Sequence, residues 1–141
     1  MNQKLEIRRA GFTLVEIMIV VGIITVLASI AIPNILRGRN RAQATQVLQD
    51  LRIIDAAIDQ YAIETNKSPG AFVSWTDVTP YMKAETRLAQ SGGRDILGNT
   101  FSGEYRVDSD FAVLVAPQTF SALSTVAPAA FWSPYMPTVV P

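Results

Sequence analysis

Two patterns of hydrophobic residues follow one another in the first half of the chain. From residue 17 to residue 32, one glycine, one threonine and one serine alone interrupt an aliphatic run. The wider stretch 12–36 contains a single charged residue, Glu16. Because about twenty consecutive apolar residues are enough for a helix to cross a bilayer, we predict a transmembrane helix at residues 12–36.

The second pattern, at residues 37–66, has the period of an amphipathic helix. Its apolar positions recur three or four residues apart, at Ala44, Val47, Leu51, Ile54, Ile58 and Tyr61. Its polar residues lie largely off that stripe, at Gln43, Gln46, Gln49, Asp50, Asp59, Gln60 and Glu64. Such spacing predicts a helix with one buried face. We expect its C-terminal half to pack on the chain's own C-terminal domain, whereas the upstream portion, residues 35–44, has fewer large apolar groups and could face neighbouring helices. The turn-forming residues Asn66, Pro69 and Gly70 predict the end of the helix.

Two residues in the apolar stretch can disturb the helix. Pro33 lacks an N–H and clashes with the preceding turn, so we expect a kink or a break there, with Gly22 as a second weak point. Counted from residue 12 to residue 65, the helix would be about 80 Å long. A globule of this size cannot contain such a rod, so half of it must be buried in lipid or in other copies of the chain.

The C-terminal half predicts a small head at residues 67–116. Ser74, followed three residues later by Asp77, predicts a capped helix start, and Pro80 limits the length of that helix. Two short strands, at 104–107 and 111–116, are expected to pair in an antiparallel fashion. The apolar sheet residues would be Tyr105, Val107, Phe111, Val113 and Val115. The predicted fold class is α+β, a long N-terminal helix packed on a small antiparallel sheet.

Residues 117–141 form a proline-rich apolar segment. It holds five of the eight prolines, and its aromatic residues are Phe120, Phe131, Trp132 and Tyr135. Proline cannot continue a helix or a central strand. We expect the aromatic residues to pack back onto the head; the alternative is an exposed patch that binds a partner.

Composition excludes several classes of function. Twelve basic residues balance twelve acidic ones, so no basic surplus is present to bind nucleic acid. The chain has no cysteine and no histidine, which removes thiolate and imidazole metal sites, disulfides and a Ser-His-Asp arrangement. We therefore predict a structural protein rather than an enzyme.

The N-terminal segment itself is open to three interpretations. It could be a secretory signal peptide cut after Ala31, a membrane anchor that is never cut, or a short basic leader removed just before the apolar helix. The positive-inside rule does not orient the span, because three basic residues precede it and three follow it. These residues are Lys4, Arg8 and Arg9 before the span, and Arg37, Arg39 and Arg41 after it.

Glu16 favours the third interpretation. A carboxylate in a membrane helix costs roughly 2.5–3.5 kcal/mol at the centre of the bilayer, and less toward the end of the helix. Cleavage after Gly11 would create a cationic amine on Phe12, one helical turn from Glu16. The acid would also lie in the first turns, where the helix dipole favours negative charge.

These residues carry a family resemblance. The stretch "GFTLVEIMIVVGIITVLASIAIP" resembles the N-terminus of type IV prepilins and type II secretion pseudopilins. Gly11 stands before the cleavage point, Phe12 becomes the first residue, Glu16 the fifth and Pro33 the twenty-second. The resemblance implies removal of residues 1–11 by a prepilin peptidase and methylation of the Phe12 amine. It also implies that Glu16 pairs with Phe12 of an adjacent subunit and sets the register of assembly.

The resemblance further implies a role and a location. The chain would be a structural subunit of a type II secretion pseudopilus, forming a helical filament of its own copies with other pseudopilins. An assembly platform membrane protein and an ATPase complex would drive assembly. The subunit would be stored in the bacterial inner membrane, with the N-terminus cytoplasmic and the head periplasmic. The filament would lie in the periplasm or at the cell surface.

Three questions stay open at this point. The arginines 37, 39 and 41 would emerge on the far side, either to contact phosphate headgroups or simply to end the span in water. Relatives with the same signal include type IV pilins for adhesion, twitching or DNA uptake. A membrane-anchored periplasmic binding domain that never polymerises is a further alternative.

Two later stretches refine the comparison. "LRIIDAAIDQYAIETNKSPG" followed by "DVTPYMK" resembles small pseudopilin-like proteins, and a chain without cysteine cannot form the disulfide loop of many true pilins. "DILGNTF" faintly resembles a "D-P-W-G-N-P-Y" segment of major pseudopilins, near which a loop binds calcium. The oxygen ligands of the right kind are Asp95, Asn99, Asp108 and Asp110. Turn chemistry explains them equally well, so we predict no cofactor and keep calcium as the weaker alternative.

Overall fold

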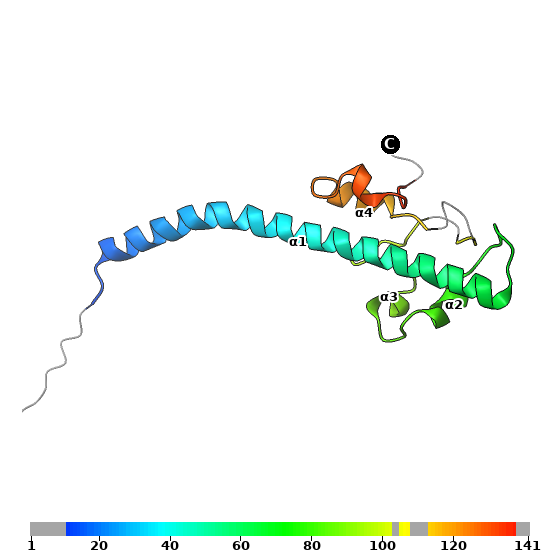
Figure 1. Ribbon diagram of the computed structural model, residues 1–141. Helices are drawn as coiled ribbons and strands as arrows, with labels where there is room; N and C mark the ends of the chain where they lie inside the picture. Colours follow the sequence, from blue (N-terminus) through cyan, green and yellow to red (C-terminus); the bar gives the residue numbers. More distant parts are fainter. Residues whose placement is uncertain (1–10, 103–104, 108–112, 138–141) are drawn as a thin grey trace, which may run out of the picture. The chain divides into compact units, whose positions relative to one another are not determined.

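The computed structural model describes residues 11–102, 105–107 and 113–137. In chain order, its elements are α1 (Leu14–Thr65), α2 (Trp75–Val78), the 3₁₀ helix η1 (Thr79–Tyr81), α3 (Arg87–Gln90), α4 (Pro117–Leu123) and the 3₁₀ helix η2 (Ala129–Trp132) (Figure 1). The chain divides into two compact units, residues 1–36 and 37–141. Helix α1 contributes to both units.

Helix α1 contains 52 residues and continues through both Gly22 and Pro33. At 1.5 Å per residue, it is about 78 Å long. The expected break at Pro33 is therefore wrong. A proline removes only one backbone hydrogen bond of the helix, the one to the carbonyl four residues earlier. The neighbouring turns remain helical. A kink at Gly22 or Pro33 stays a prediction.

The end of α1 agrees with the sequence. Asn66 adopts a positive φ of 49°, and the Lys67 amide donates a hydrogen bond of 3.1 Å to the Ala62 carbonyl. Asparagine tolerates this left-handed conformation better than most residues, which is why it often follows the last turn of a helix. The predicted stop is confirmed.

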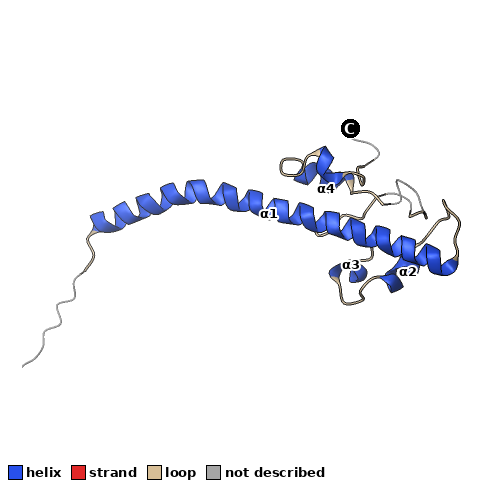
Figure 2. Ribbon diagram, in the orientation of Figure 1, coloured by secondary structure: helices blue, strands red, loops and turns tan. Residues whose placement is uncertain are grey.

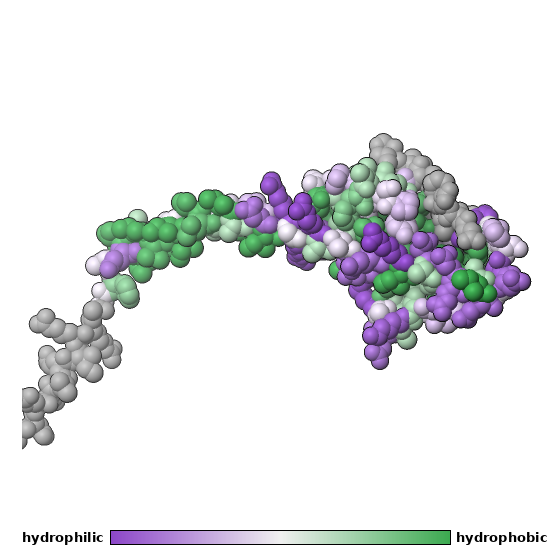
Figure 3. Space-filling model, in the orientation of Figure 1, coloured by the Kyte–Doolittle hydropathy of each residue, from purple (hydrophilic) through white to green (hydrophobic). Residues whose placement is uncertain are grey.

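In the first unit, the described residues 11–36 expose their side chains almost everywhere. The large aliphatic side chains of this part of α1 are each at least half exposed, and Figure 3 shows the resulting apolar surface. By length and composition, α1 can cross a membrane. An apolar face of this extent is not stable in water, because burial of hydrophobic surface is the main driving force for folding and association.

In the second unit, α1 forms one wall of the hydrophobic core. The predicted stripe is confirmed: five of its members are buried and Tyr61 is partly buried. The buried stripe residues are Ala44, Val47, Leu51, Ile54 and Ile58. Asp50 is also buried, with 2% of its surface exposed, although the sequence pattern placed it on the polar side. That placement was wrong because the head covers a wider arc of α1 than the apolar stripe alone.

Two segments of the head cover α1 from different sides (Figures 1 and 2). On one side, the Tyr81 hydroxyl donates a 2.8 Å hydrogen bond to Glu64, and the Tyr81 ring meets Tyr61 edge-on at 6.0 Å. On another side, the Tyr135 hydroxyl donates a 3.1 Å hydrogen bond to Asp55. Ser74 and Asp77 form the predicted capping box of α2, with the Ser74 amide 2.9 Å from the carboxylate.

The expected two-stranded sheet is only partly visible. Within the described residues there is no strand, but three isolated antiparallel bridges pair Phe72 with Arg106, Arg94 with Thr100, and Ser102 with Leu114. Residues 105–107 thus pair with residues 70–73, a partner that the sequence pattern did not indicate. Part of each predicted strand, including Phe111 and the connecting residues, lies outside the described residues.

The C-terminal segment packs back onto the head, as predicted. Pro117 occupies the first turn of α4, where its missing N–H costs nothing. Trp132 is completely buried, and its Nε1 donates a 3.1 Å hydrogen bond to the Ala127 carbonyl. The Val115 amide donates a 3.0 Å hydrogen bond to the Tyr135 carbonyl. Segment 117–137 therefore contributes Leu123, Ala127 and Trp132 to the hydrophobic core.

The Tyr135 hydroxyl gives the head a pH-dependent contact. Burial, with the nearby Asp55 charge, raises the pKa of Tyr135 to about 12, compared with about 10 in an unfolded chain. The folded state holds the Tyr135 proton more tightly than the unfolded chain does. The contribution of this proton to the stability of the head is therefore complete below pH 10 and is lost as the pH rises toward 12.

Between pH 10 and 12, the free energy of unfolding should fall by about 1 kcal/mol less in Tyr135→Phe than in the unmodified chain. This figure is reduced for the partial exposure of the ring. Urea unfolding at several pH values measures this. The hydrogen bond to Glu64 raises the pKa of Tyr81, and burial raises the pKa of Tyr105. These two tyrosines should account for the pH dependence of stability that remains in the variant. An unaltered slope in the variant would contradict the assignment.

Candidate functional site

The peptide bond between Gly11 and Phe12 lies outside the helix and is exposed. Residues 11–13 precede the first turn of α1, and the Phe12 side chain is 82% exposed. A Cβ atom built on Gly11 would meet nothing within 4 Å. The chain therefore makes no steric demand for glycine here. Any requirement for a small residue must come from whatever binds this bond.

Thr13 and Glu16 form a capping box at the start of α1. The Thr13 amide and the Thr13 hydroxyl each donate a 2.9 Å hydrogen bond to Oε2 of Glu16. In return, the Glu16 amide donates a 3.2 Å hydrogen bond to the Thr13 hydroxyl. Two amides that a helix start normally leaves unpaired are satisfied in this way. The pattern T-x-x-E was visible in the sequence, and its capping role was missed.

The capping box changes the interpretation of Glu16 in the uncut chain. From the sequence, cleavage after Gly11 is the expected source of a partner for this acid, whereas in the structure Thr13 already donates hydrogen bonds to it. Only Oε2 is used, however: within the described residues, Oε1 of Glu16 accepts no hydrogen bond. One carboxylate oxygen can therefore cap α1 while the other accepts a bond from an amine. Pairing with the Phe12 amine stays a prediction.

A family profile described as "Prokaryotic N-terminal methylation motif" matches residues 7–32. The match spans the Gly11–Phe12 bond, the capping box and the apolar part of α1 up to the residue before Pro33. The chain carries an N-terminal methylation motif. This methylation motif covers less than a fifth of the chain, so it describes the N-terminal segment and leaves the head aside.

Curated relatives with the same kind of similarity come from secretion and fimbrial systems. Type II secretion system core protein G of Klebsiella pneumoniae is 39% identical over 62 residues, 44% of each chain. The protein of the same name from Vibrio cholerae is 34% identical over 62 residues, 44% of this chain and 42% of that one. Type IV major fimbrial protein FimA of Dichelobacter nodosus is 39% identical over 66 residues, 47% of this chain and 41% of that one.

The chain thus spans less than half the length of the curated relatives it matches. No solved structure matches it. The names of these relatives denote parts of a secretion system or a fimbria, in agreement with the prediction of a structural protein rather than an enzyme.

The candidate calcium ligands are only partly described. Asp95 is buried, and its Oδ1 accepts 2.9 Å hydrogen bonds from the amides of Leu97 and Asn99. Its Oδ2 accepts a hydrogen bond from the Thr119 hydroxyl, which also accepts one from Asn99 at 2.9 Å. Asp95 therefore shapes the 95–99 turn and joins it to α4. Asp108 and Asp110 lie outside the described residues, and within the described ones no group of three acidic residues could hold a metal.

Asp50 is a buried charge that the sequence pattern did not reveal. Arg87, on α3, donates a hydrogen bond to Oδ2 of Asp50 and forms an ion pair with it. Gln46 donates a 2.9 Å hydrogen bond to Oδ1. Burial raises the pKa of Asp50, and the negative charge of Asp95 adds to this effect, while Gln46 and Arg87 oppose it. The ion pair joins α3 to α1.

Removing Arg87 should destabilise the head in a pH-dependent manner. In Arg87→Met, the buried carboxylate loses its counter-charge, and we expect a loss of about 1–3 kcal/mol at pH 7, less than for a fully buried pair because Arg87 is partly exposed. The variant raises the folded pKa of Asp50 further. The deficit should therefore shrink as the pH falls toward the unfolded value of about 4.

Urea unfolding of both proteins at neutral and acidic pH measures this deficit. Lys83→Met, an exposed change in the same segment, is the matched control and should stay within about 0.5 kcal/mol of the unmodified chain. A deficit of equal size at both pH values would contradict the role of the ion pair.

Proposed function

We propose that this chain is a structural subunit of a type II secretion pseudopilus. The methylation motif on residues 7–32 is the observation that carries the proposal. The subunit is stored in the inner membrane by α1, trimmed after Gly11, and methylated on Phe12. It is then packed into a helical filament with copies of itself and with other pseudopilins.

Assembly follows from the exposed apolar half of α1. In the bilayer, lipid tails cover these side chains; in the filament, neighbouring α1 helices cover them. Lipid tails are as apolar as leucine, so the exchange gains little from hydrophobicity alone, and close packing and polar pairs decide which arrangement forms. The pair proposed here joins the free Oε1 of Glu16 to the Phe12 amine of an adjacent subunit and thereby fixes the register.

Orientation and partners complete the proposal. The basic leader stays in the cytoplasm, where a prepilin peptidase removes it, and the head lies in the periplasm. An assembly platform membrane protein and an ATPase complex extract subunits and add them to the filament. The isolated antiparallel bridges, which involve Arg106 and Leu114, support the proposal that the head contains a small antiparallel sheet. The proposed role requires no cofactor.

Intact-mass measurement of the protein extracted from its host membrane tests the proposal. We expect loss of residues 1–11 and the addition of one methyl group. A bulky residue in place of Gly11, such as Gly11→Leu, should leave the leader attached, because the space around Gly11 is free in this chain and the peptidase alone rejects the side chain. Gly11→Ala, the small control, should be processed at least in part.

The mass also separates the proposal from its rivals. A protein that still begins at Met1 would be an uncut anchor carrying a binding domain, and one that begins after Ala31 would have carried a secretory signal. In either case, the amine partner of Glu16 would never form, and the pseudopilus assignment would fall.

A type IV pilin is the second candidate, favoured by the similarity to the fimbrial protein of Dichelobacter nodosus. Both candidates predict the same processed mass. Electron microscopy of cells that express the chain at its normal level distinguishes them, because surface fibres indicate a pilin and their absence beside active secretion indicates a pseudopilin.

A further inference from the structure

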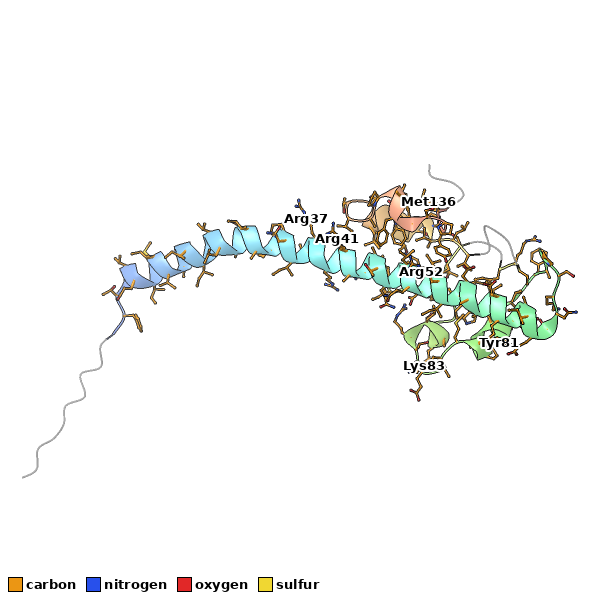
Figure 4. The ribbon with its side chains drawn as sticks, viewed as in Figure 1. Arg37, Arg41, Arg52, Tyr81, Lys83 and Met136 are labelled. Atoms are coloured by element: carbon orange, nitrogen blue, oxygen red, sulfur yellow. The ribbon has the colours of Figure 1, made fainter. Side chains whose placement is uncertain are left out.

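Three arginines surround α1 just beyond its apolar part. Arg37, Arg39 and Arg41 are exposed, and within the described residues none of them forms an ion pair. With 3.6 residues per turn, Arg37 and Arg41 lie on nearly the same face of the helix and Arg39 lies on the opposite face. We name these three residues the arginine collar. Figure 4 shows the side chains of Arg37 and Arg41 extending away from the helix.

The geometry of the collar suits a flat surface that lies across the helix axis and surrounds the helix. Its three Cα atoms lie within about 6 Å along the axis, yet the side chains point in opposite directions. A protein partner that docks on one side of α1 would contact one or two of them. A membrane surface, which surrounds a helix that crosses it, contacts all three at once.

The distance along the chain fits this placement. Residues 17–36 carry no charge, and twenty helical residues extend about 30 Å, which is the thickness of the hydrocarbon core. When these residues span the bilayer, Glu16 lies at one headgroup layer and the collar at the other. The long arginine side chains can then place their guanidinium groups among phosphates while their aliphatic parts stay in contact with apolar surface.

Within the part of the chain that the structure describes, no acidic side chain is paired with the collar. The sequence contains no Asp or Glu between Glu16 and Asp50. Asp50 is buried and already paired with Arg87. Guanidinium groups bind phosphate through two parallel hydrogen bonds, so an uncompensated set of three favours phosphate-bearing lipid and favours net anionic lipid most.

We propose that the arginine collar binds the phosphate headgroups of anionic phospholipids and recruits these lipids around the stored subunit. The proposal rests on the membrane-stored state described under the proposed function and adds the lipid partner of that state. Bound lipid must leave the collar before the subunit enters a filament. The collar therefore adds to the free energy needed to extract the subunit from the membrane.

The experiment measures local lipid composition. The full chain lacks cysteine, so Gly38→Cys, at a position where a Cβ meets nothing within 4 Å, provides a single labelling site inside the collar. The labelled protein is placed in nanodiscs of phosphatidylcholine and phosphatidylglycerol, and quenching is compared for nitroxide headgroups on one lipid or on the other. We expect about fivefold stronger quenching by the anionic lipid, the enrichment typical of one basic residue at such a surface.

A matched pair of charge-removal variants decides the source of this preference. The collar variant carries Arg37→Gln, Arg39→Gln and Arg41→Gln, and its quenching should be equal for the two lipids. The control carries Arg52→Gln, Lys67→Gln and Lys83→Gln, three exposed basic residues elsewhere in the chain, and should keep the full preference. Equal quenching by the two lipids in the unmodified chain, or a preference for the anionic lipid that survives in the collar variant, would overturn the proposal that the collar binds anionic lipid.

Membrane storage is checked separately by resistance to alkaline extraction. A chain that is extracted from the bilayer would overturn the proposed function and the collar together. A chain that resists extraction but shows no lipid preference would overturn the collar alone.

Discussion

Glu16→Gln is expected to impair filament assembly strongly while leaving cleavage after Gly11 intact. Glutamine retains a side-chain oxygen for the capping box with Thr13, because Gln serves at this position of a capping box as well as Glu. It loses the negative charge that pairs with the Phe12 amine. Removing one member of a buried ion pair typically costs 3–5 kcal/mol, so we expect assembled protein to fall more than about tenfold.

Sheared filaments quantified against total membrane protein give the assembled fraction, and intact mass reports cleavage. Thr13→Val is the complementary variant, because it removes the hydroxyl from the capping box and leaves the charge of Glu16 in place. It should assemble far better than Glu16→Gln. If Glu16→Gln assembles at the normal level, or if Thr13→Val fails equally, the carboxylate acts as a helix cap and the register pair does not exist.

Trp132→Ala is expected to cause the largest loss of stability in the head. Trp132 is completely buried, it is part of the hydrophobic core, and its indole N–H is satisfied by the Ala127 carbonyl. Truncating a buried aromatic side chain to alanine typically costs 3–5 kcal/mol. For a head of this size, we expect the melting temperature to fall by at least about 10 °C.

Thermal unfolding of the full chain in detergent, followed by the near-ultraviolet signal of the head, measures this loss. Ile63→Ala is the control, because Ile63 is 81% exposed on α1 and its truncation should change stability by less than about 0.5 kcal/mol. Trp132→Phe, which fills most of the volume but has no N–H, should fall between the two. A melting temperature unaltered by Trp132→Ala would show that the C-terminal segment contributes nothing to the head.

The sequence alone determined the long helix and its division into an apolar part and an amphipathic part. The uncharged apolar run predicts a helix that needs cover from lipid or other copies of the chain, and the three-four spacing beside it predicts a helix that packs on its own head. Asn66 marked the end of α1 and the pair of Ser74 and Asp77 marked α2, because both signals depend on backbone geometry within a few residues. The capping box at Thr13 and Glu16 is equally local, and the spacing T-x-x-E indicates it in the sequence.

The tertiary structure decided what depends on residues far apart in the chain. Asp50 was assigned to the polar face, and only the packing of α3 on α1 buries it beside Arg87. Helix α1 continues through Pro33 because the turns on both sides outweigh one missing hydrogen bond. Residues 105–107 pair with 70–73, since strand pairing is a choice among many partners that alternation cannot rank. Local signals fix where an element begins and ends, whereas burial of a charge or the choice of a pairing partner depends on the whole folded chain.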